Sequence, residues 1–123
     1  MEIEHCIRQQ ADLPQINRCR SRIASLKVAF QHVSQVLELA GNPVRLKILL
    51  LLYEEKRLCV CDLSDVLGMT IPAISQHLKR LKVRHVVASD KQAQTVFYSL
   101  TSQYISILRP LFRTLVTAVG ATP

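Results

Sequence analysis

Long hydrophobic runs are absent from this sequence. The longest wholly apolar run extends from Ile48 to Tyr53, which is too short to span a bilayer. The first residues, MEIEHCIRQQ, are acidic and then polar, and they contain no apolar signal region. We therefore expect a cytoplasmic protein that has no membrane partner.

Aromatic and acidic residues are also scarce. The 123 residues include no Trp, three Phe and three Tyr, and only nine Asp and Glu stand against 16 Lys and Arg, so the net charge is +7. Such a charge favours an anionic partner, usually nucleic acid or a membrane surface, although a basic surface without a partner has the same composition. The length corresponds to one domain, or to one domain with a short arm.

Helical periodicity dominates the first half of the chain. Asp12 and Pro14 have the pattern of a helix start, and we expect one helix from residue 13 to residue 40. Its apolar residues recur at helical spacing: Leu26, Phe30, Val33, Leu37 and Ala40. A second helix should follow Pro43, with Arg45 facing away from the core. Its inward face is expected to contain Val44, Ile48, Leu51 and Leu52.

A helix-turn-helix pattern follows. Residues 60–67 predict a short helix that ends at Gly68, and Thr70 is positioned to cap another helix. The apolar positions of that second helix are Ile71, Ile74, Leu78 and Leu81, and its opposite face is polar and basic. Two short helices around a turn that contains glycine, the second amphipathic and basic, are typical of a helix-turn-helix.

The period then changes from helical to extended. Residues 85–89 and 95–99 are rich in β-branched and aromatic side chains, and they flank a polar turn at residues 90–93, which predicts a hairpin. After Thr101 a helical apolar stripe returns, and Pro110 within it predicts a kink or the true helix start. The stripe contains Ile105, Leu108, Leu111, Phe112, Leu115 and Val119.

These elements together predict a mainly α fold with a β-hairpin wing, that is, a winged helix-turn-helix. The first and last helices are more apolar than a lone domain of this length needs. We therefore expect a homodimer that forms through its first and last helices.

The second helix of the pair and the segment after it are basic. Between Gln76 and Lys91 lie five Lys or Arg residues and one acid. Cations attract phosphates, whereas Ser, Gln and His side chains can bond base edges in the major groove. The DNA-binding candidates are Lys79, Arg80, Lys82 and Lys91 for the backbone, Ser75, Gln76 and His77 for the bases, and Thr70 at the helix start. A solvated helix face is the alternative.

Two of the four cysteines, Cys59 and Cys61, are separated by one residue at the start of the short helix. Inside a helix, residues at this spacing point about 200° apart and could not share a ligand. If Cys59 is still extended and Cys61 lies in the first turn, both sulfur atoms can turn to the same side. A helix N-terminus favours thiolate, the form that binds metal. Two buried, inert cysteines are the alternative interpretation.

The context limits what the cysteines can do. In a reducing cytosol, four cysteines are more typical of metal ligands or redox groups than of a disulfide framework. A thiol enzyme is excluded, because the sequence has no C-x-x-C at a βαβ turn and no base with an orienting partner around a cysteine. Metal binding and thiol redox chemistry remain; in the latter an arm cysteine forms a disulfide with Cys59 or Cys61.

Three stretches resemble the ArsR/SmtB family of metal-sensing repressors: LAGNPVRLKILLLL, RLCVCDLSDVLGMTIPAISQHLKRLK and VFYSL, of which LCVCDL is the specific element. The resemblance implies an ArsR-type winged helix-turn-helix domain over residues 25–119, preceded by an arm and helix start at residues 1–24. It further implies a homodimer that binds a palindromic, double-stranded operator DNA and releases it when metal binds.

Within this family the cysteine pattern is similar to that of CadC-like sensors. The resemblance implies that Cys59 and Cys61 of one subunit join arm cysteines of the other subunit, Cys19 and Cys6. Sulfur ligands suit soft ions, which are cadmium, lead and mercury, or arsenite and antimonite. The effector is therefore expected to be a soft metal ion or metalloid, and no organic cofactor is expected.

The sequence departs from the family in four places. The two arm cysteines of CadC-like sensors are close together, whereas Cys6 and Cys19 are thirteen residues apart, so only one of them is expected to bind with a given ion. The arsenite-sensing pattern resembles C-x-C-x-x-C, but Ser64 stands at its third position. Residues 102–119 contain no Asp, His or Glu, so the zinc site of the last helix is not expected here. The wing has Ala93 and Gln94 where the family usually has a glycine and a basic residue.

Overall fold

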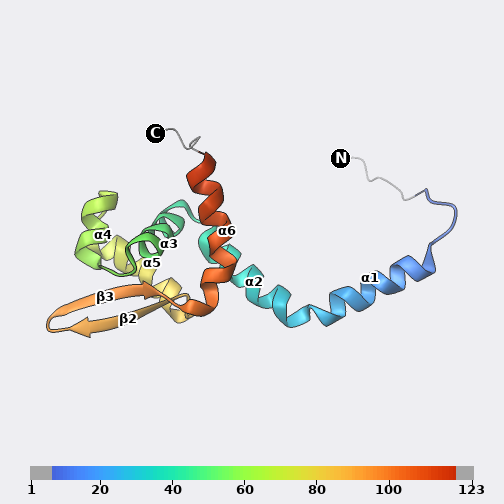
Figure 1. Cartoon of the computed structure of the whole chain (residues 1–123), viewed down its shortest axis with the longest axis horizontal. Helices are drawn as coiled ribbons and strands as arrows, with labels where there is room; N and C mark the ends of the chain where they lie inside the picture. Colours follow the sequence, from blue (N-terminus) through green and yellow to red (C-terminus); the bar gives the residue numbers. More distant parts are fainter. Residues whose placement is uncertain (1–6, 119–123) are drawn as a thin grey trace. The chain divides into compact units, whose positions relative to one another are not determined.

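The computed structural model describes residues 7–118, and Figure 1 labels their helices and strands. The elements are α1 (Leu13–Ser25), α2 (Lys27–Ala40), α3 (Pro43–Glu55), β1 (Leu58–Cys59), α4 (Val60–Leu67), α5 (Ile71–Val83), β2 (Val87–Gln92), β3 (Thr95–Leu100) and α6 (Ser102–Ala118). The chain divides into two compact units, Met1–His32 and Val33–Pro123. The predicted boundary between residues 24 and 25 falls inside the first unit.

The start of α1 follows the prediction, because the Asp12 carboxylate accepts a hydrogen bond from the Gln15 N–H at 3.0 Å. The prediction of a single helix over residues 13–40 is wrong, since Leu26 interrupts it with φ −104° and ψ 12°. The Leu26 N–H is shared among carbonyls of the preceding turn, and the Ser25 hydroxyl donates to the Arg22 carbonyl at 2.8 Å. Such bonds tighten a last turn and end the regular helix.

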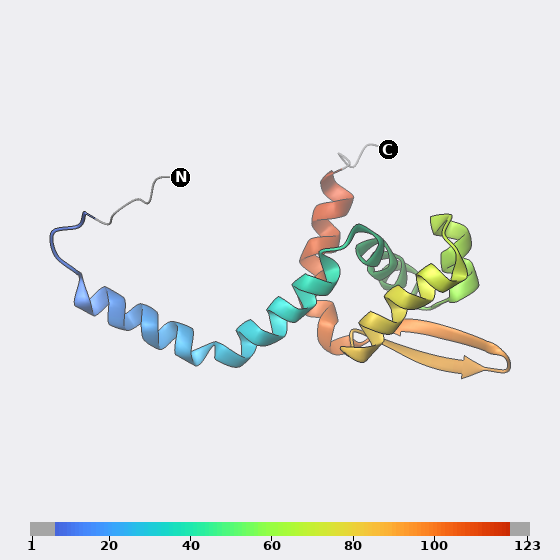
Figure 2. The same ribbon diagram turned by 180° about the vertical axis from the view of Figure 1, so that it is seen from behind.

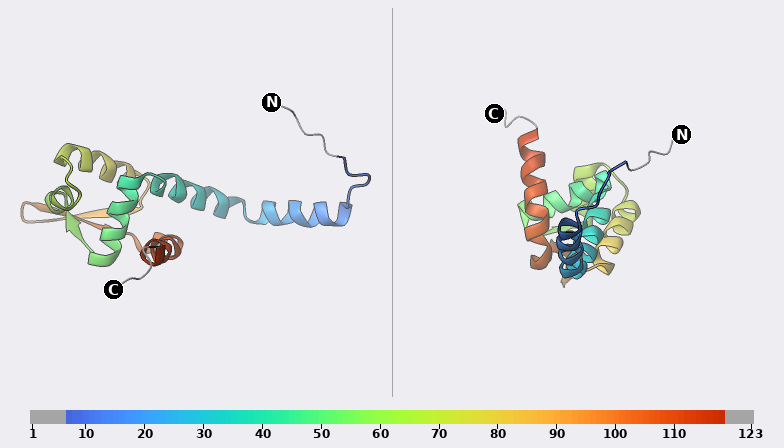
Figure 3. Two further views of the ribbon diagram at one scale, coloured as in Figure 1. Left: turned by 90° about the horizontal axis from the view of Figure 1, so that it is seen from above. Right: turned by 90° about the vertical axis from the view of Figure 1, so that its right-hand side faces the viewer.

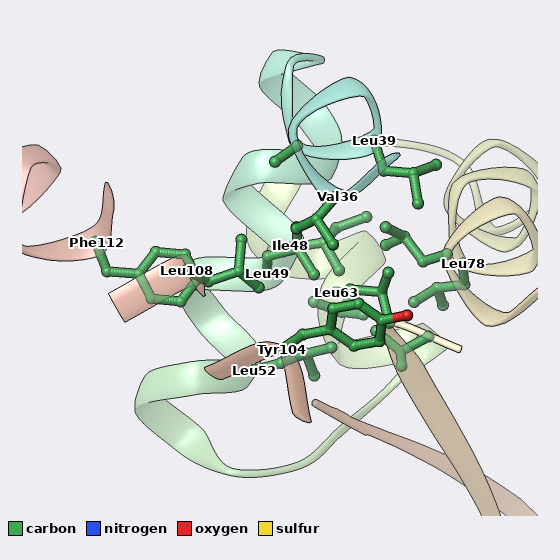
Figure 4. Packing of buried hydrophobic residues seen from close by; sticks show 14 of the residues in the cluster. Val36, Leu39, Ile48, Leu49, Leu52, Leu63, Leu78, Tyr104, Leu108 and Phe112 are labelled. Atoms are coloured by element: carbon green, nitrogen blue, oxygen red, sulfur yellow. The ribbon is translucent and has the colours of Figure 1, made fainter. Parts of the chain in front are cut away.

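The hydrophobic core of the described residues lies in the second unit, where side chains from α2, α3, α4, α5 and α6 converge (Figure 4). The core includes Val36, Leu39, Ile48, Leu49, Leu52, Leu63, Ile74, Leu78, Leu81, Tyr104, Leu108 and Phe112. Three of the four apolar positions predicted for α5 are therefore buried, whereas Ile71 is 48% exposed. By contrast, α1 buries none of its residues.

At the start of α3, one prediction from the sequence is wrong. Asn42 caps the helix as its side-chain oxygen accepts bonds from the N–H groups of Val44 and Arg45 at 2.9 and 3.1 Å. Arg45 was expected to face away from the core, but its side chain is only 9% exposed. Its Nε donates to the Leu39 carbonyl in the last turn of α2 at 2.7 Å. A carbonyl near a helix end needs such a donor, and this need explains why a cation is buried here.

The predicted hairpin forms, but its turn is displaced. β2 and β3 pair antiparallel as far as Gln92 and Thr95, so the turn consists of Ala93 and Gln94 rather than residues 90–93. Ala93 has φ 57°, a conformation that glycine adopts more easily. The hairpin extends beyond the helices of the second unit (Figures 1 and 3).

Strand β1 was not predicted from the sequence. Its two residues, Leu58 and Cys59, pair antiparallel with Tyr98 and Phe97 of β3. The sheet therefore has three strands in the order β1-β3-β2. As a result, the cysteine strand and the wing belong to one sheet.

The last helix, α6, continues through Pro110, so Pro110 does not mark its start. Leu108 and Phe112 of the predicted stripe are buried, together with Tyr104. Ile105, Leu111 and Leu115 are half-buried, and Val119 lies outside the described residues. A mainly helical fold with a small antiparallel sheet as its wing confirms the predicted winged helix-turn-helix. Residues 7–118 form no helix with the length and apolar character that membrane crossing requires.

Candidate functional site

The helix-turn-helix consists of α4, a turn at Gly68, and α5. Gly68 ends α4 with φ 63° and ψ 35°, a left-handed conformation that glycine tolerates because it has no Cβ. The Ser64 hydroxyl donates to the Met69 carbonyl across this turn. Thr70 then caps α5, since its Oγ1 accepts a bond from the Ala73 N–H at 3.3 Å. Figure 2 shows α5 running across the front of the second unit.

Most side chains predicted to bind DNA are exposed. They are Thr70, Ser75, Gln76, Lys79, Arg80, Lys82 and Lys91. The Lys82 ammonium donates to the Ser89 hydroxyl on β2 at 2.6 Å, so this cation links the helix to the wing. Exposed cations on α5 can contact phosphates, and the amide and hydroxyl groups beside them can contact base edges.

His77 differs from its neighbours on α5, because its side chain is half-buried. Its Nδ1 atom is buried and forms no hydrogen bond with any residue that the structure describes. Burial lowers the pKa of the imidazole below the ordinary 6.5, and the positive charges of Arg45 and Arg80 lower it further. The imidazole is therefore held neutral at neutral pH, and Nδ1 is not placed to contact a base.

The cysteine pair has the helix-start backbone that the sequence predicts. Cys59 is extended, with φ −90° and ψ 168°, and it directly precedes α4, whose first turn contains Cys61. Cys59 is half-buried, Cys61 is exposed, and both thiols are free. Two free thiols at one helix start are a donor set for a soft ion.

The structure does not test whether the other two predicted ligands join this pair. Cys19 is a free, exposed thiol on α1 in the first unit, and Cys6 lies outside the described residues. Within residues 7–118, no three His, Cys, Asp or Glu side chains are grouped so that they could hold a metal ion.

A contact that the sequence analysis missed lies beside the cysteine strand. The Arg57 guanidinium carbon is 4.2 Å from the centroid of the Phe97 ring. A cation over an aromatic face is attracted by the electrons of the ring. No sequence signal indicates this pair, because it depends on the pairing of the two-residue strand β1 with β3.

A groove between α2 and α5 also escaped the sequence analysis. Its volume is about 270 Å³. The polar residues that line it are Gln35, Glu38, Lys79, Arg80 and Arg84. Lys79 and Arg80 were predicted to contact the DNA backbone, whereas Gln35, Glu38 and Arg84 were not singled out.

A helix-turn-helix whose second helix has an exposed basic face, followed by a β-hairpin wing, defines a winged-helix DNA-binding protein. Residues 42–87 match the family described as bacterial regulatory protein, arsR family. The chain belongs to the ArsR family.

Relatives of known name agree with this assignment. The cadmium resistance transcriptional regulatory protein CadC of Listeria innocua is 34% identical over 83 residues, which cover 68% of each chain. The structure of reduced HlyU from Vibrio cholerae is 32% identical with a TM-score of 0.66, and the match covers 72% of this chain and 94% of HlyU. The antimony-specific transcriptional repressor AntR is 28% identical with a TM-score of 0.63, covering 76% and 81% of the two chains. CadC and AntR are named as transcriptional regulators rather than enzymes, in agreement with the exclusion of a thiol enzyme.

Proposed function

We propose that this protein is a transcriptional repressor that leaves its operator DNA when a soft metal ion or metalloid binds to Cys59 and Cys61. The observation that carries the proposal is the position of this pair at the start of α4, directly before α5. Thiolates prefer cadmium, lead, mercury, or trivalent arsenic and antimony over hard ions. Because α4 packs against α5, an ion that displaces the start of α4 acts on the DNA-binding helix.

The names of two relatives support a soft effector. CadC of Listeria innocua is named for cadmium resistance, and AntR is described as antimony-specific. Cadmium and antimony are both thiophilic, so the two relatives share a class of effector although their particular ions differ. For this chain we therefore propose a thiophilic ion as the class of effector.

The proposed repressor is a homodimer, in which an arm cysteine of one subunit completes the site on the other. Cys19 is the first candidate and Cys6 the second. Exposed apolar side chains on α2 and α6 support an interface, because a dimer that forms through these helices would remove their apolar surface from water. These side chains are Val28, Phe30 and Leu37 on α2 and Val116 on α6. Such a repressor acts in the cytoplasm, where its operator lies.

A DNA-release titration tests the proposal. A fluorescent duplex that the protein has selected from a random pool is bound by reduced, metal-free protein, and cadmium, lead, mercury, arsenite or antimonite is added. At least one ion should release the duplex at the stoichiometry at which sulfur-to-metal charge-transfer absorption appears. The Cys59→Ser/Cys61→Ser variant should bind the duplex and fail to release it. Release of this variant at the parent's metal concentration contradicts the proposal.

Thiol redox sensing is the second candidate. Cys19, Cys59 and Cys61 are free thiols, and the chain is similar to a structure described as reduced HlyU. In this alternative, peroxide oxidises an arm cysteine and one cysteine of the pair to a disulfide, and it is itself reduced to water. Peroxide added with a metal chelator should then release the duplex, and excess thiol should restore binding. Unchanged DNA affinity under these conditions excludes this candidate.

A further inference from the structure

We propose that the groove between α2 and α5 binds a phosphate group, which is either a backbone phosphate of DNA or part of a free phosphate ligand. Three cations line it, Lys79, Arg80 and Arg84, against a single acid, Glu38. For a DNA phosphate the inference rests on the proposed repressor function, since it adds a contact from α2 and from the end of α5.

The three cations are unpaired. Within the described part of the chain, none of the Lys79, Arg80 and Arg84 side chains forms a hydrogen bond or ion pair, and the Glu38 carboxylate lies beyond ion-pair distance of all three. Unpaired cations that line one hollow raise the local positive potential, and their N–H groups are donors of the kind that phosphate oxygens accept. The Gln35 side chain adds a neutral donor from α2.

The backbone of α5 brings these cations to one side. Residues 79, 80, 83 and 84 follow helical spacing, so they occupy one face of the helix, toward α2. The backbone at the C-terminal end of this face is held by a hydrogen bond that does not involve the Arg84 side chain. The hydroxyl of the buried Tyr104 donates to the Arg84 carbonyl at 3.1 Å. Replacing the Arg84 side chain therefore leaves its backbone anchor intact.

The electrostatic potential next to the groove also favours an anion. Leu39 lines the groove and accepts the bond from Arg45, and His77 lies beside Arg45 and Arg80. The pKa of His77 is lowered first by burial and then by these two arginines. A field that disfavours an additional positive charge at His77 favours a negative charge nearby.

Helix capping is the competing explanation for these cations. Arg80 lies in the last turn of α5 and Arg84 at its C-cap, where positive charge stabilises the helix dipole. A capping role predicts lower stability when a cation is removed, with no specific change in phosphate binding. The experiment therefore measures unfolding and phosphate binding on the same variants.

The first arm uses a DNA duplex of arbitrary sequence, because a phosphate contact does not depend on sequence. Arg84→Gln is compared with Lys47→Gln, which removes the same charge from an exposed position on α3. If the groove holds a DNA phosphate, Arg84→Gln should weaken binding by roughly three- to tenfold and reduce the salt slope by about one, and Lys47→Gln should do neither. Because this arm uses neither operator DNA nor metal, its result does not depend on whether the metal-release proposal is correct.

The second arm uses pyrophosphate without DNA, titrated into the full chain in a calorimeter. If a free ligand is the source, pyrophosphate binds the parent, Arg84→Gln abolishes that binding, and the DNA salt slope is unchanged. Glu38→Gln should strengthen whichever interaction is found, a gain that loss of folding cannot produce. The proposal is overturned if Arg84→Gln matches Lys47→Gln in both arms, including the case in which only its unfolding free energy falls.

Discussion

Cys59 and Phe97 lie opposite each other in the antiparallel pairing of β1 with β3. Cys59 also directly precedes α4, so this one residue adjoins both the helix-turn-helix and the sheet of the wing. An ion held by the Cys59 thiolate would therefore act on α5 through α4 and on the hairpin through β3. The interaction of Arg57 with the Phe97 ring adds a side-chain link at the same place.

The link between Arg57 and Phe97 should be measurable as a coupling free energy. In a double-mutant cycle with Arg57→Gln and Phe97→Leu, we expect a coupling of about 0.5–1 kcal/mol, the usual size of an exposed cation–π contact. Urea unfolding of the parent, the two single variants and the double variant gives this value. Strictly additive effects would show that the contact contributes nothing to stability.

A complementation experiment tests whether the cysteine site is shared between subunits. Cys19→Ser protein and Cys59→Ser/Cys61→Ser protein should each respond poorly to metal. Mixed dimers of the two contain one intact pair facing one intact Cys19, so a shared site predicts that mixing restores metal-induced release in part. A site within one subunit would give no recovery, since each chain then lacks a ligand. Cys6→Ser is the matched arm variant and should lower metal affinity less than Cys19→Ser.

Substitutions on α5 should separate affinity from specificity. Lys79→Ala is expected to weaken binding to all DNA sequences alike and to lower the salt slope, because a phosphate contact carries no sequence information. Gln76→Ala should instead reduce discrimination between operator and altered duplexes by about 1–3 kcal/mol for each lost base contact. Competition binding with a set of duplexes that differ at single base pairs measures both effects. Unchanged discrimination by Gln76→Ala would remove Gln76 from the base contacts.

Local signals predicted the fold well. The cap at Asp12, the glycine at Gly68 and the cap at Thr70 act within a few residues of themselves, and the structure confirms all three. The break at Leu26 was missed because it depends on a side-chain bond from Ser25 that competes with a periodic apolar pattern.

Features that depend on distant residues could not be predicted from one sequence. Arg45 is charged, and only the nearby Leu39 carbonyl explains its burial. Strand β1 has two residues, too few for a periodic pattern, and it exists through its pairing with β3. The groove forms where α2 meets α5, so neither helix alone indicates it. The cysteine pair was found because its spacing and its place at a helix start are both local.

The stability of the fold should depend on pH through His77. Its folded pKa is lowered below 6.5, so between that lowered value and about 6.5 the unfolded chain binds more protons than the folded chain. The contribution of neutral His77 is therefore fully present above pH 6.5, and it declines as the pH falls until the folded pKa is passed. Urea unfolding at several pH values should show a smaller acid-side decline for His77→Gln than for the parent. Equal declines would show that other groups control the effect.

The last prediction concerns Arg45, which is buried at the junction of α2, α3 and α5. Arg45→Met fills similar space but removes the donor to the Leu39 carbonyl, and an unsatisfied buried acceptor costs about 1–3 kcal/mol. The matched control is Lys47→Met on the exposed side of α3, which should change the unfolding free energy by less than about 0.5 kcal/mol. Arg45→Met also removes a positive charge beside His77, so the pKa of His77 should rise toward its ordinary value and the acid-side loss of stability should shrink. Urea unfolding of both variants at neutral and acidic pH measures the two effects together. If Arg45→Met were as stable as Lys47→Met at neutral pH, the bond to Leu39 would not be the reason that this cation is buried.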